Sequence, residues 1–158
     1  MVIDNGSRKI KFCDNTLQVM KKYIQTNCKS CEAGGILVGR ENCGNSNLII
    51  EFITEPMPSD RRSRCRYLRK DVGHLNFFKR VHEENDGIYG YIGEWHTHPE
   101  KIPQYSFIDS SNWKKIGKEM KGGIQYHVIA GIQEVGIWEY NAATKKIVQI
   151  SSIEWKRI

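Results

Sequence analysis

Residues 88–120 constrain the fold most, because a strand pattern gives way there to a helix pattern within a few residues. The segment IYGYIGEWHTH (88–98) is aromatic and β-branched, which is typical of a strand, and Pro99 ends it. A helix is expected from about Ser106, since an inward stripe follows at spacings of four, three and four: Asp109, Trp113, Ile116 and Met120. This segment predicts a strand joined to a helix by a short loop.

Similar patterns predict further strands on both sides of this segment. The first is expected at SRKIKFC (7–13), while AGGILVG (33–39) and LIIEFITE (48–55) are expected to pair as a hairpin. Three strands separated by short turns are expected to finish the chain: YHVIAGI (126–132), VGIWEY (135–140) and KIVQISSIEW (146–155).

Two more helices are predicted. The first begins at the capping residues Asp14–Thr16, ends at Asn27–Ser30 and turns one face inward: Leu17, Met20, Ile24 and Cys28. The second begins at Asp71 and turns Leu75, Phe78 and Val81 inward. Strands and helices mixed in this way predict a single domain over residues 1–158, with a three-layer α/β fold and a mixed central sheet flanked by helices.

The composition fits a globular domain that stays inside the cell. Hydrophobic residues make up 39% and charged residues 27% of the 158 residues, which argues against a disordered or fibrous chain. The start lacks a long apolar run with a cleavage site, and no stretch of eighteen apolar residues occurs, so neither export nor a membrane is expected. Five cysteines are an odd number without an extracellular cue, which favours reduced thiols and a cytoplasmic location.

A basic segment, RRSRCRYLRK (61–70), carries much of the net charge of +6. It is interpreted either as a solvated loop or as a surface for phosphate or for an acidic protein. No RNA-binding, zinc-finger or helix-turn-helix motif accompanies it, so nucleic acid is not the expected partner.

The window from His96 to Asp109 contains the ligands of a catalytic metal. Side chains alternate along a strand, so His96 and His98 project from the same face. Ser106 and Asp109 have the spacing of a capping box, which places Asp109 in the first turn of a helix. Two imidazoles and one carboxylate give zinc three ligands and leave its fourth position for water or substrate. Motifs of nucleobase deaminases and thermolysin-like proteases do not occur.

A zinc-activated water also needs a proton acceptor, and two acids compete for that role. Glu94 lies on the same strand face as His96. Glu32 precedes the glycine-rich AGGILVG, where backbone or substrate can come close. Their spacing alone does not choose between them.

Two motifs match a known family without a gap. EAGGILVG matches E-x-x-G-x-L-x-G, and HTHPEKIPQYSFID matches H-x-H-P-x(6)-S-x-x-D. The chain thus resembles the JAMM (MPN+, JAB) zinc metalloproteases. The resemblance implies the family's three-layer, cytidine deaminase-like fold and one zinc ion per chain, bound by His96, His98 and Asp109. It also implies that Glu32 accepts and returns the water proton and that Ser106 helps to hold the oxyanion of the tetrahedral intermediate.

The resemblance also suggests roles for residues outside these motifs. Glu94 occupies the place where familiar eukaryotic members have tryptophan, and we expect it to accept a hydrogen bond that orients an imidazole. In such an enzyme the basic segment lies between a strand and a helix. There Arg61, Arg62 and Arg64 are expected to bind an extended substrate tail through carboxylates and strand addition.

A narrower resemblance rests on GGILVGR, GEWHTHPE and the stretch from Pro58 to Arg62. These segments resemble stand-alone bacterial JAB proteases encoded beside cGAS-like nucleotidyltransferases in anti-phage (CBASS) operons. The resemblance implies an isopeptidase or peptidase that cleaves after the C-terminal residue of such a nucleotidyltransferase or of a ubiquitin-like protein. The alternative is a JAMM-fold scaffold that binds nucleic acid through residues 61–70.

Overall fold

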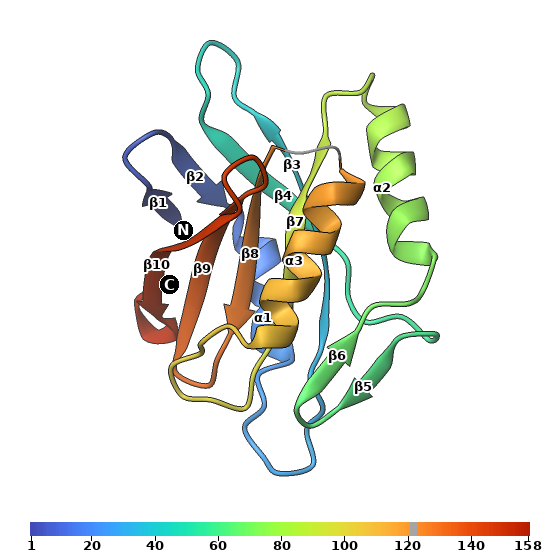
Figure 1. Cartoon of the computed structure of the whole chain (residues 1–158), viewed down its shortest axis with the longest axis vertical. Coiled ribbons are helices and arrows are strands. Elements are labelled where there is room, and N and C mark those ends of the chain that lie inside the picture. The colour runs from blue at the N-terminus through green and yellow to red at the C-terminus, as the bar shows by residue number, and fades with distance from the viewer. Residues whose placement is uncertain (121–122) are drawn as a thin grey trace.

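The computed structural model describes residues 1–120 and 123–158 and contains an eight-stranded sheet and a two-stranded ribbon (Figure 1). The strand order in the sheet is β1-β2-β4-β3-β7-β8-β9-β10. The bounds are β1 Val2–Asp4, β2 Lys9–Phe12, β3 Gly34–Glu41, β4 Leu48–Ile53, β7 Gly90–Thr97, β8 Ile124–Ala130, β9 Glu134–Asn141 and β10 Lys146–Glu154. The β2–β4 and β7–β8 pairs are parallel and the other pairs are antiparallel, so the sheet is mixed, as predicted.

Helices cover both faces of this sheet. Their bounds are α1 Asp14–Lys22, α2 Gly73–Glu84 and α3 Phe107–Glu119, and a 3-10 turn spans Trp155–Arg157. Leu37 and Val128 pack in the core cluster that includes α1, whereas their neighbours Ile36 and Ile129 pack in the clusters that include α2 and α3. Adjacent strand residues point to opposite faces. The fold therefore has three layers, with α1 behind the sheet and α2 and α3 in front (Figure 1), which confirms the predicted class.

The strand β7, the helix α3 and the strand β8 form the unit that carries the site. Because β7 and β8 are parallel, the chain must cross over between them, and α3 makes that crossover on one face of the sheet. β7 also pairs with β3, so His96 lies opposite Gly34 on one side and Ile129 on the other. The end of β7 is thus in the middle of the sheet, beside the start of α3.

Most predicted elements are present, and α1 is the one whose length differs most. The β3–β4 hairpin and the three final strands are confirmed. Helix α1 ends at Lys22, so Ile24 and Cys28 lie beyond it. Ile24 still packs against the core, but Cys28 is exposed, so its predicted inward position is wrong. The chain turns there because Gln25 is buried and its amide donates to the carbonyls of Ser30 and Arg64.

Two inward-facing predictions on the other helices are wrong. Leu75 is exposed, and His74 is buried in its place because its imidazole bonds with Thr54 and Asp60. Met120 is exposed because α3 stops at Glu119. Within residues 1–120 and 123–158, no helix is long and apolar enough to cross a membrane.

The basic segment folds as a β-ribbon where the sequence suggested a loop. Strands β5 (Arg61–Ser63) and β6 (Arg66–Leu68) pair antiparallel and are called the β5–β6 hairpin below. The hairpin lies beside the sheet, below α2 (Figure 1). The short strand β1 was not predicted either.

Candidate metal centre and active site

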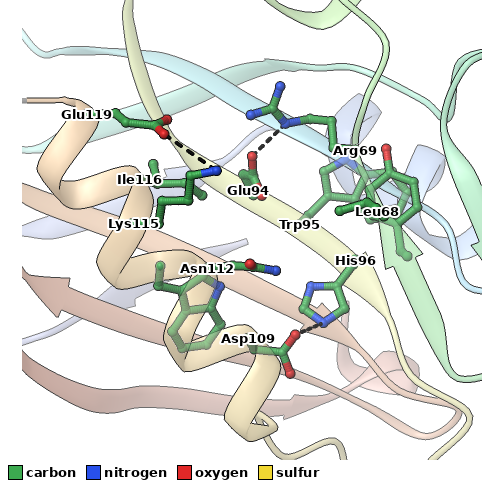
Figure 2. A pocket seen from close by; sticks show the side chains of 12 residues that line it. Leu68, Arg69, Glu94, Trp95, His96, Asp109, Asn112, Lys115, Ile116 and Glu119 are labelled. Carbon is green, nitrogen blue, oxygen red and sulfur yellow. Dashed lines mark hydrogen bonds and ion pairs between the residues drawn. The ribbon is translucent and has the colours of Figure 1, made fainter.

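The capping box at the start of α3 fixes the carboxylate of the centre. Ser106 has an extended backbone, and its hydroxyl accepts a hydrogen bond from the Asp109 N–H at 3.2 Å. In return, the N–H and the hydroxyl of Ser106 donate to Asp109 Oδ2 at 2.6 and 2.7 Å. Oδ1 of Asp109 remains turned towards His96, whose Nε2 lies 3.1 Å away (Figure 2). The predicted helix start therefore also orients a ligand.

The structure brings His96, His98 and Asp109 together. The two Nε2 atoms are 3.0 Å apart, and His98 Nε2 lies 3.5 Å from Asp109 Oδ2. One ligand atom from each residue lies within 4.8 Å of the others. Ligand atoms around a tetrahedral zinc at about 2.0–2.1 Å are roughly 3.3 Å apart, so these spacings suit a zinc ion. Two imidazole nitrogens and one carboxylate are also the ligand types that zinc accepts.

The ionisation of the three groups favours a cation between them. Burial alone would raise the pKa of Asp109, but hydrogen bonds from His96 and Ser106 hold that pKa well below its usual range. Burial opposes a charge on His96, yet the Asp109 carboxylate raises the His96 pKa. Burial and the nearby charge of His96 lower the pKa of His98. Asp109 is therefore held as a carboxylate, and a metal ion that binds His96 Nε2 needs that nitrogen without its proton.

Glu32 is held next to this cluster by the strand that follows it. The Ala33 N–H donates to Thr97 Oγ1 at 3.0 Å, and the Thr97 N–H donates to the Ala33 carbonyl at 2.8 Å. Thr97 stands between the two histidines, so the pairing sets Glu32 beside them. Glu32 is 4% exposed, and its burial raises its pKa to about 7, although His96 opposes this shift. A carboxylate with such a pKa is suited to accept and return a proton near neutral pH.

The hydrogen-bond partners of Glu94 are not the predicted ones. Its Oε1 accepts hydrogen bonds from Arg69 Nε at 2.6 Å and from the Tyr91 hydroxyl at 3.1 Å. Among the described residues, it makes no hydrogen bond to an imidazole. The sequence analysis predicted that a histidine N–H would donate to Glu94. The donor is instead Arg69, which follows β6 (Figure 2).

A groove extends from His96 and Asp109 along α3. Its cavity measures about 140 Å³ and is bordered by His96 and Asp109 at one end (Figure 2). The other lining residues come from β6 and its end (Tyr67, Leu68, Arg69), from β7 (Glu94, Trp95) and from α3 (Asn112, Trp113, Lys115, Ile116, Glu119).

The three arginines expected to bind substrate are placed differently from one another. Arg62 donates to the Glu32 carbonyl at 2.7 Å, and Arg64 donates to the Asn27 carbonyl at 2.9 Å. Both side chains thus hold loops of the protein itself. Arg61 is exposed on β5 and borders a shallow surface hollow together with Arg66 and Leu68.

Sequence reasoning did not single out Tyr67, Arg69 or Asp60. Tyr67 and Arg69 line the groove, and Asp60 accepts hydrogen bonds at the base of the hairpin. All three lie in or beside a run of charged residues that looks solvated. A tyrosine and an aspartate with no obvious role at the edges of that run were the available signal.

Comparisons with known proteins agree with this geometry. Residues 22–143 match the model of the family described as prokaryotic homologs of the JAB domain. A protein of Escherichia coli (strain TW11681) named CD-NTase/cGAS isopeptidase is 34% identical over 111 residues, which cover 70% of each chain. A protein of the same name from Pseudomonas aeruginosa (strain BWHPSA011 / Pa011) is 30% identical over 118 residues, covering 75% of this chain and 73% of the relative.

A solved structure has a similar fold. Protein DSY2949 from Desulfitobacterium hafniense superposes with a TM-score of 0.59 over 89% of this chain and 88% of its own. Because only 15% of the residues are identical, this similarity concerns the fold alone.

Proposed function

The chain belongs to the family of prokaryotic homologs of the JAB domain, and from that premise we propose that it is a zinc-dependent isopeptidase. Its proposed substrate is a cGAS-like nucleotidyltransferase, or a ubiquitin-like protein, joined to another protein through its C-terminal residue. The bond after that residue is the one cleaved, in bacterial anti-phage defence. The relatives named CD-NTase/cGAS isopeptidase support this substrate.

One observation carries the proposal: His96, His98 and Asp109 bring three possible metal ligands together, buried Glu32 lies near them, and His96 and Asp109 border a groove. We assign His96, His98 and Asp109 as the ligands of one zinc ion. Glu32 is the proposed proton acceptor, because its burial gives it a pKa near neutrality.

The proposed reaction is hydrolysis of an amide bond. Bound at this cluster, zinc supplies a Lewis acid that acidifies water and polarises a carbonyl. Glu32 accepts the proton from the attacking water and later delivers it to the leaving amine. Asp109 is kept in its ligand orientation by the N–H and hydroxyl of Ser106. The groove beside β6 aligns the extended tail of the substrate.

Ser106 has two separable roles in this proposal. It caps α3, and in the proposed reaction its hydroxyl hydrogen turns from Asp109 Oδ2 to the oxyanion that forms on the substrate carbonyl, while the Ser106 N–H keeps its bond to Asp109. Ser106→Ala should lower the free energy of unfolding by about 1 kcal/mol through loss of the cap. It should also lower kcat by about 10²–10³-fold through loss of the oxyanion donor. Thermal unfolding and steady-state kinetics measure the two effects.

The control for Ser106 is Ser106→Thr, which retains a capping hydroxyl. It should preserve most of the stability and much of the activity. If Ser106→Ala is less stable but turns over at the wild-type rate, the hydroxyl is only a helix cap.

Arg61 is an exposed arginine of the hairpin, and we expect it to contact an acidic part of the substrate. Arg61→Glu should raise KM several-fold and change kcat little, because a contact made equally in ground and transition states affects binding only. Lys146→Glu, the same charge reversal on the exposed edge strand β10, is the matched control. An unaltered KM in Arg61→Glu would exclude this role.

The proposed function is tested with a conjugate of defined chemistry. A bacterial cGAS-like nucleotidyltransferase is joined through its C-terminal residue to a reporter protein, and a ubiquitin-like fusion serves as a second substrate. The zinc-loaded protein should release the reporter from at least one of them, and a chelator should stop the reaction. Salt-dependent binding to nucleic acid without any cleavage would instead favour the scaffold alternative.

A further inference from the structure

The β5–β6 hairpin holds Glu32 from several sides. The Glu32 N–H donates to the Ser63 carbonyl at 2.8 Å, and its carbonyl accepts the bond from Arg62. The main chain of Tyr67 faces the Glu32 carboxylate and stabilises its charged form. The Tyr67 ring lies directly on Gly34, since a Cβ atom at Gly34 would be only 2.5 Å from it. A displaced hairpin would therefore displace Glu32.

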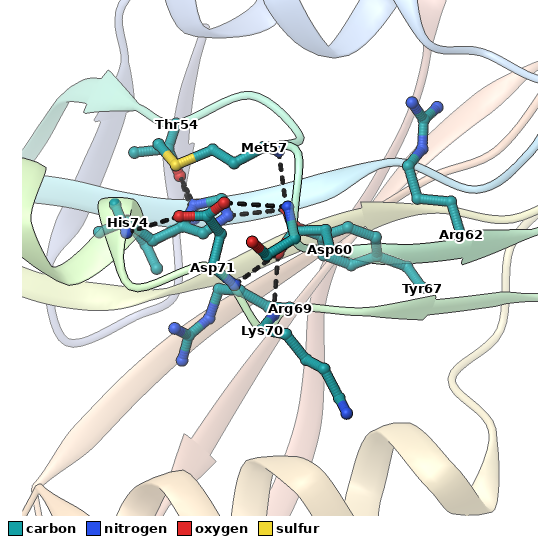
Figure 3. Close-up of polar contacts among 12 residues, drawn as sticks. Thr54, Met57, Asp60, Arg62, Tyr67, Arg69, Lys70, Asp71 and His74 are labelled. Atoms are coloured by element: carbon teal, nitrogen blue, oxygen red, sulfur yellow. Dashed lines mark hydrogen bonds and ion pairs between the residues drawn. The ribbon is translucent and has the colours of Figure 1, made fainter.

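Asp60 closes the base of this hairpin. Its side chain is fully buried and accepts five hydrogen bonds from residues on both sides of β5 and β6 (Figure 3). Oδ1 accepts from the N–H groups of Lys70 (2.8 Å) and Asp71 (3.0 Å), and Oδ2 accepts from the Met57 N–H (2.8 Å), the Tyr67 hydroxyl (2.9 Å) and His74 Nε2 (2.8 Å). One carboxylate thus joins the chain before β5 to the chain after β6.

His74 connects Asp60 to the central sheet. Its Nδ1 faces Thr54 Oγ1 at 2.5 Å, and Thr54 Oγ1 accepts the Ile36 N–H of β3 at 2.9 Å. The Thr54 carbonyl accepts from Trp95 Nε1 at 2.9 Å, next to His96 on β7. The base of the hairpin is therefore anchored through Thr54 to Ile36 of β3 and Trp95 of β7; the bond from His74 to Thr54 is seen in Figure 3.

The network is satisfied only if Asp60 is a carboxylate. With the proton of His74 on Nε2, the Thr54 hydroxyl donates to Nδ1, and the side-chain polar atoms of Asp60, His74 and Thr54 all have partners. Burial alone would raise the pKa of Asp60, but the donors from Met57, Asp71 and His74 hold it well below its usual range. An amide at this position would turn an NH₂ group towards N–H and O–H donors and leave several of them without an acceptor.

We propose that Asp60 is a positioning residue for the hydrolytic reaction: it locks the β5–β6 hairpin to the sheet, and the hairpin holds Glu32 beside the metal ligands. The inference rests on the proposed function, because it assigns Asp60 an effect on catalysis through Glu32. Neither Asp60 nor His74 borders the groove, so neither contacts the substrate there.

The test compares Asp60→Asn with the wild type at equal zinc content and below the unfolding temperature of both. We expect kcat per folded, zinc-loaded molecule to fall by about tenfold or more, with KM changing less, since a small displacement of a catalytic group is enough for such a loss. The same substitution is then made in Glu32→Gln. There, Asp60→Asn should leave the residual single-turnover rate unchanged, because the group that it positions is already lost.

Two results would overturn the inference while leaving the proposed function intact. One is a wild-type kcat in folded Asp60→Asn, and the other is the same fold loss in the Glu32→Gln background as in the wild type. A wild-type protein that cleaves neither conjugate would instead refute the proposed function itself.

If Asp60→Asn does not fold, Tyr67→Phe is the variant that tests the inference. It removes one donor to Asp60 and keeps the ring on Gly34, so kcat should fall, by less than in Asp60→Asn. Tyr89→Phe is the matched control, since it also breaks a tyrosine–carboxylate bond, to Glu51, at the opposite end of β7 from His96. Equal kcat values in Tyr67→Phe and Tyr89→Phe would overturn the inference.

Discussion

Glu32→Gln will lower kcat by about 10³-fold while the protein stays folded and still binds zinc. The amide matches the carboxylate in shape but cannot accept the proton of the attacking water, and general acid–base catalysis contributes roughly 10²–10⁴-fold. Glu94→Gln makes the same chemical change in the lining of the groove, where the carboxylate pairs with Arg69. It should reduce activity less, and the reverse order would contradict the assignment of Glu32.

The stability of the metal-free protein provides an independent check on Glu32. Burial raises its pKa from 4.5 to about 7. Between these values Glu32 is protonated in the folded chain and ionised in the unfolded chain, so the contribution of Glu32 to the free energy of unfolding falls as the pH rises through this window. The loss is on the order of 3 kcal/mol.

Glu32→Gln should remove this pH dependence and make the metal-free protein more stable than the wild type at about pH 8. Urea unfolding with a chelator, at about pH 5 and about pH 8, measures the effect. Equal pH dependence in both proteins would show that Glu32 has an ordinary pKa.

His96→Ala will abolish both zinc binding and cleavage. Loss of an outer hydrogen-bond partner of a metal ligand typically lowers affinity by about 10–100-fold, so loss of a ligand should exceed about 100-fold. Zinc content after dialysis and cleavage of the nucleotidyltransferase conjugate are the measurements. The folded variant should contain less than a tenth of the wild-type zinc, roughly, and show no turnover.

His82→Ala is the matched control for the ligand variant. His82 lies on α2, where its Nδ1 bonds with the Tyr89 carbonyl, and it takes no part in the metal centre. It should retain one zinc per chain and full activity. Full zinc content in His96→Ala would mean that the metal is bound elsewhere.

The sequence predicted the metal centre better than its surroundings. The alternation of β7 and the capping box of α3 are local patterns, and together they place His96, His98 and Asp109 within a short stretch. The only further element needed was the crossover from β7 to β8, which brings the start of α3 beside the end of β7. The three-layer class followed in the same way from local periodicity.

The β5–β6 hairpin could not be predicted because tertiary hydrogen bonds, and not local propensity, stabilise it. Its strands have three residues each, rich in arginine, and local propensity gives no reason for them to pair. The hairpin forms because Asp60 closes its base and Gln25 binds the Arg64 carbonyl at its tip. Glu94 was misjudged for the same reason, since its partner Arg69 comes from this hairpin's end.

The most direct measurement is an X-ray anomalous-difference map, recorded at the zinc absorption edge from crystals of the zinc-loaded protein. We expect one peak per chain, bonded to Nε2 of His96, Nε2 of His98 and the carboxylate of Asp109 at about 2.0–2.2 Å, with the Glu32 carboxylate facing it. A peak at the cysteines, or a zinc that lacks one of these three ligands, would contradict the account.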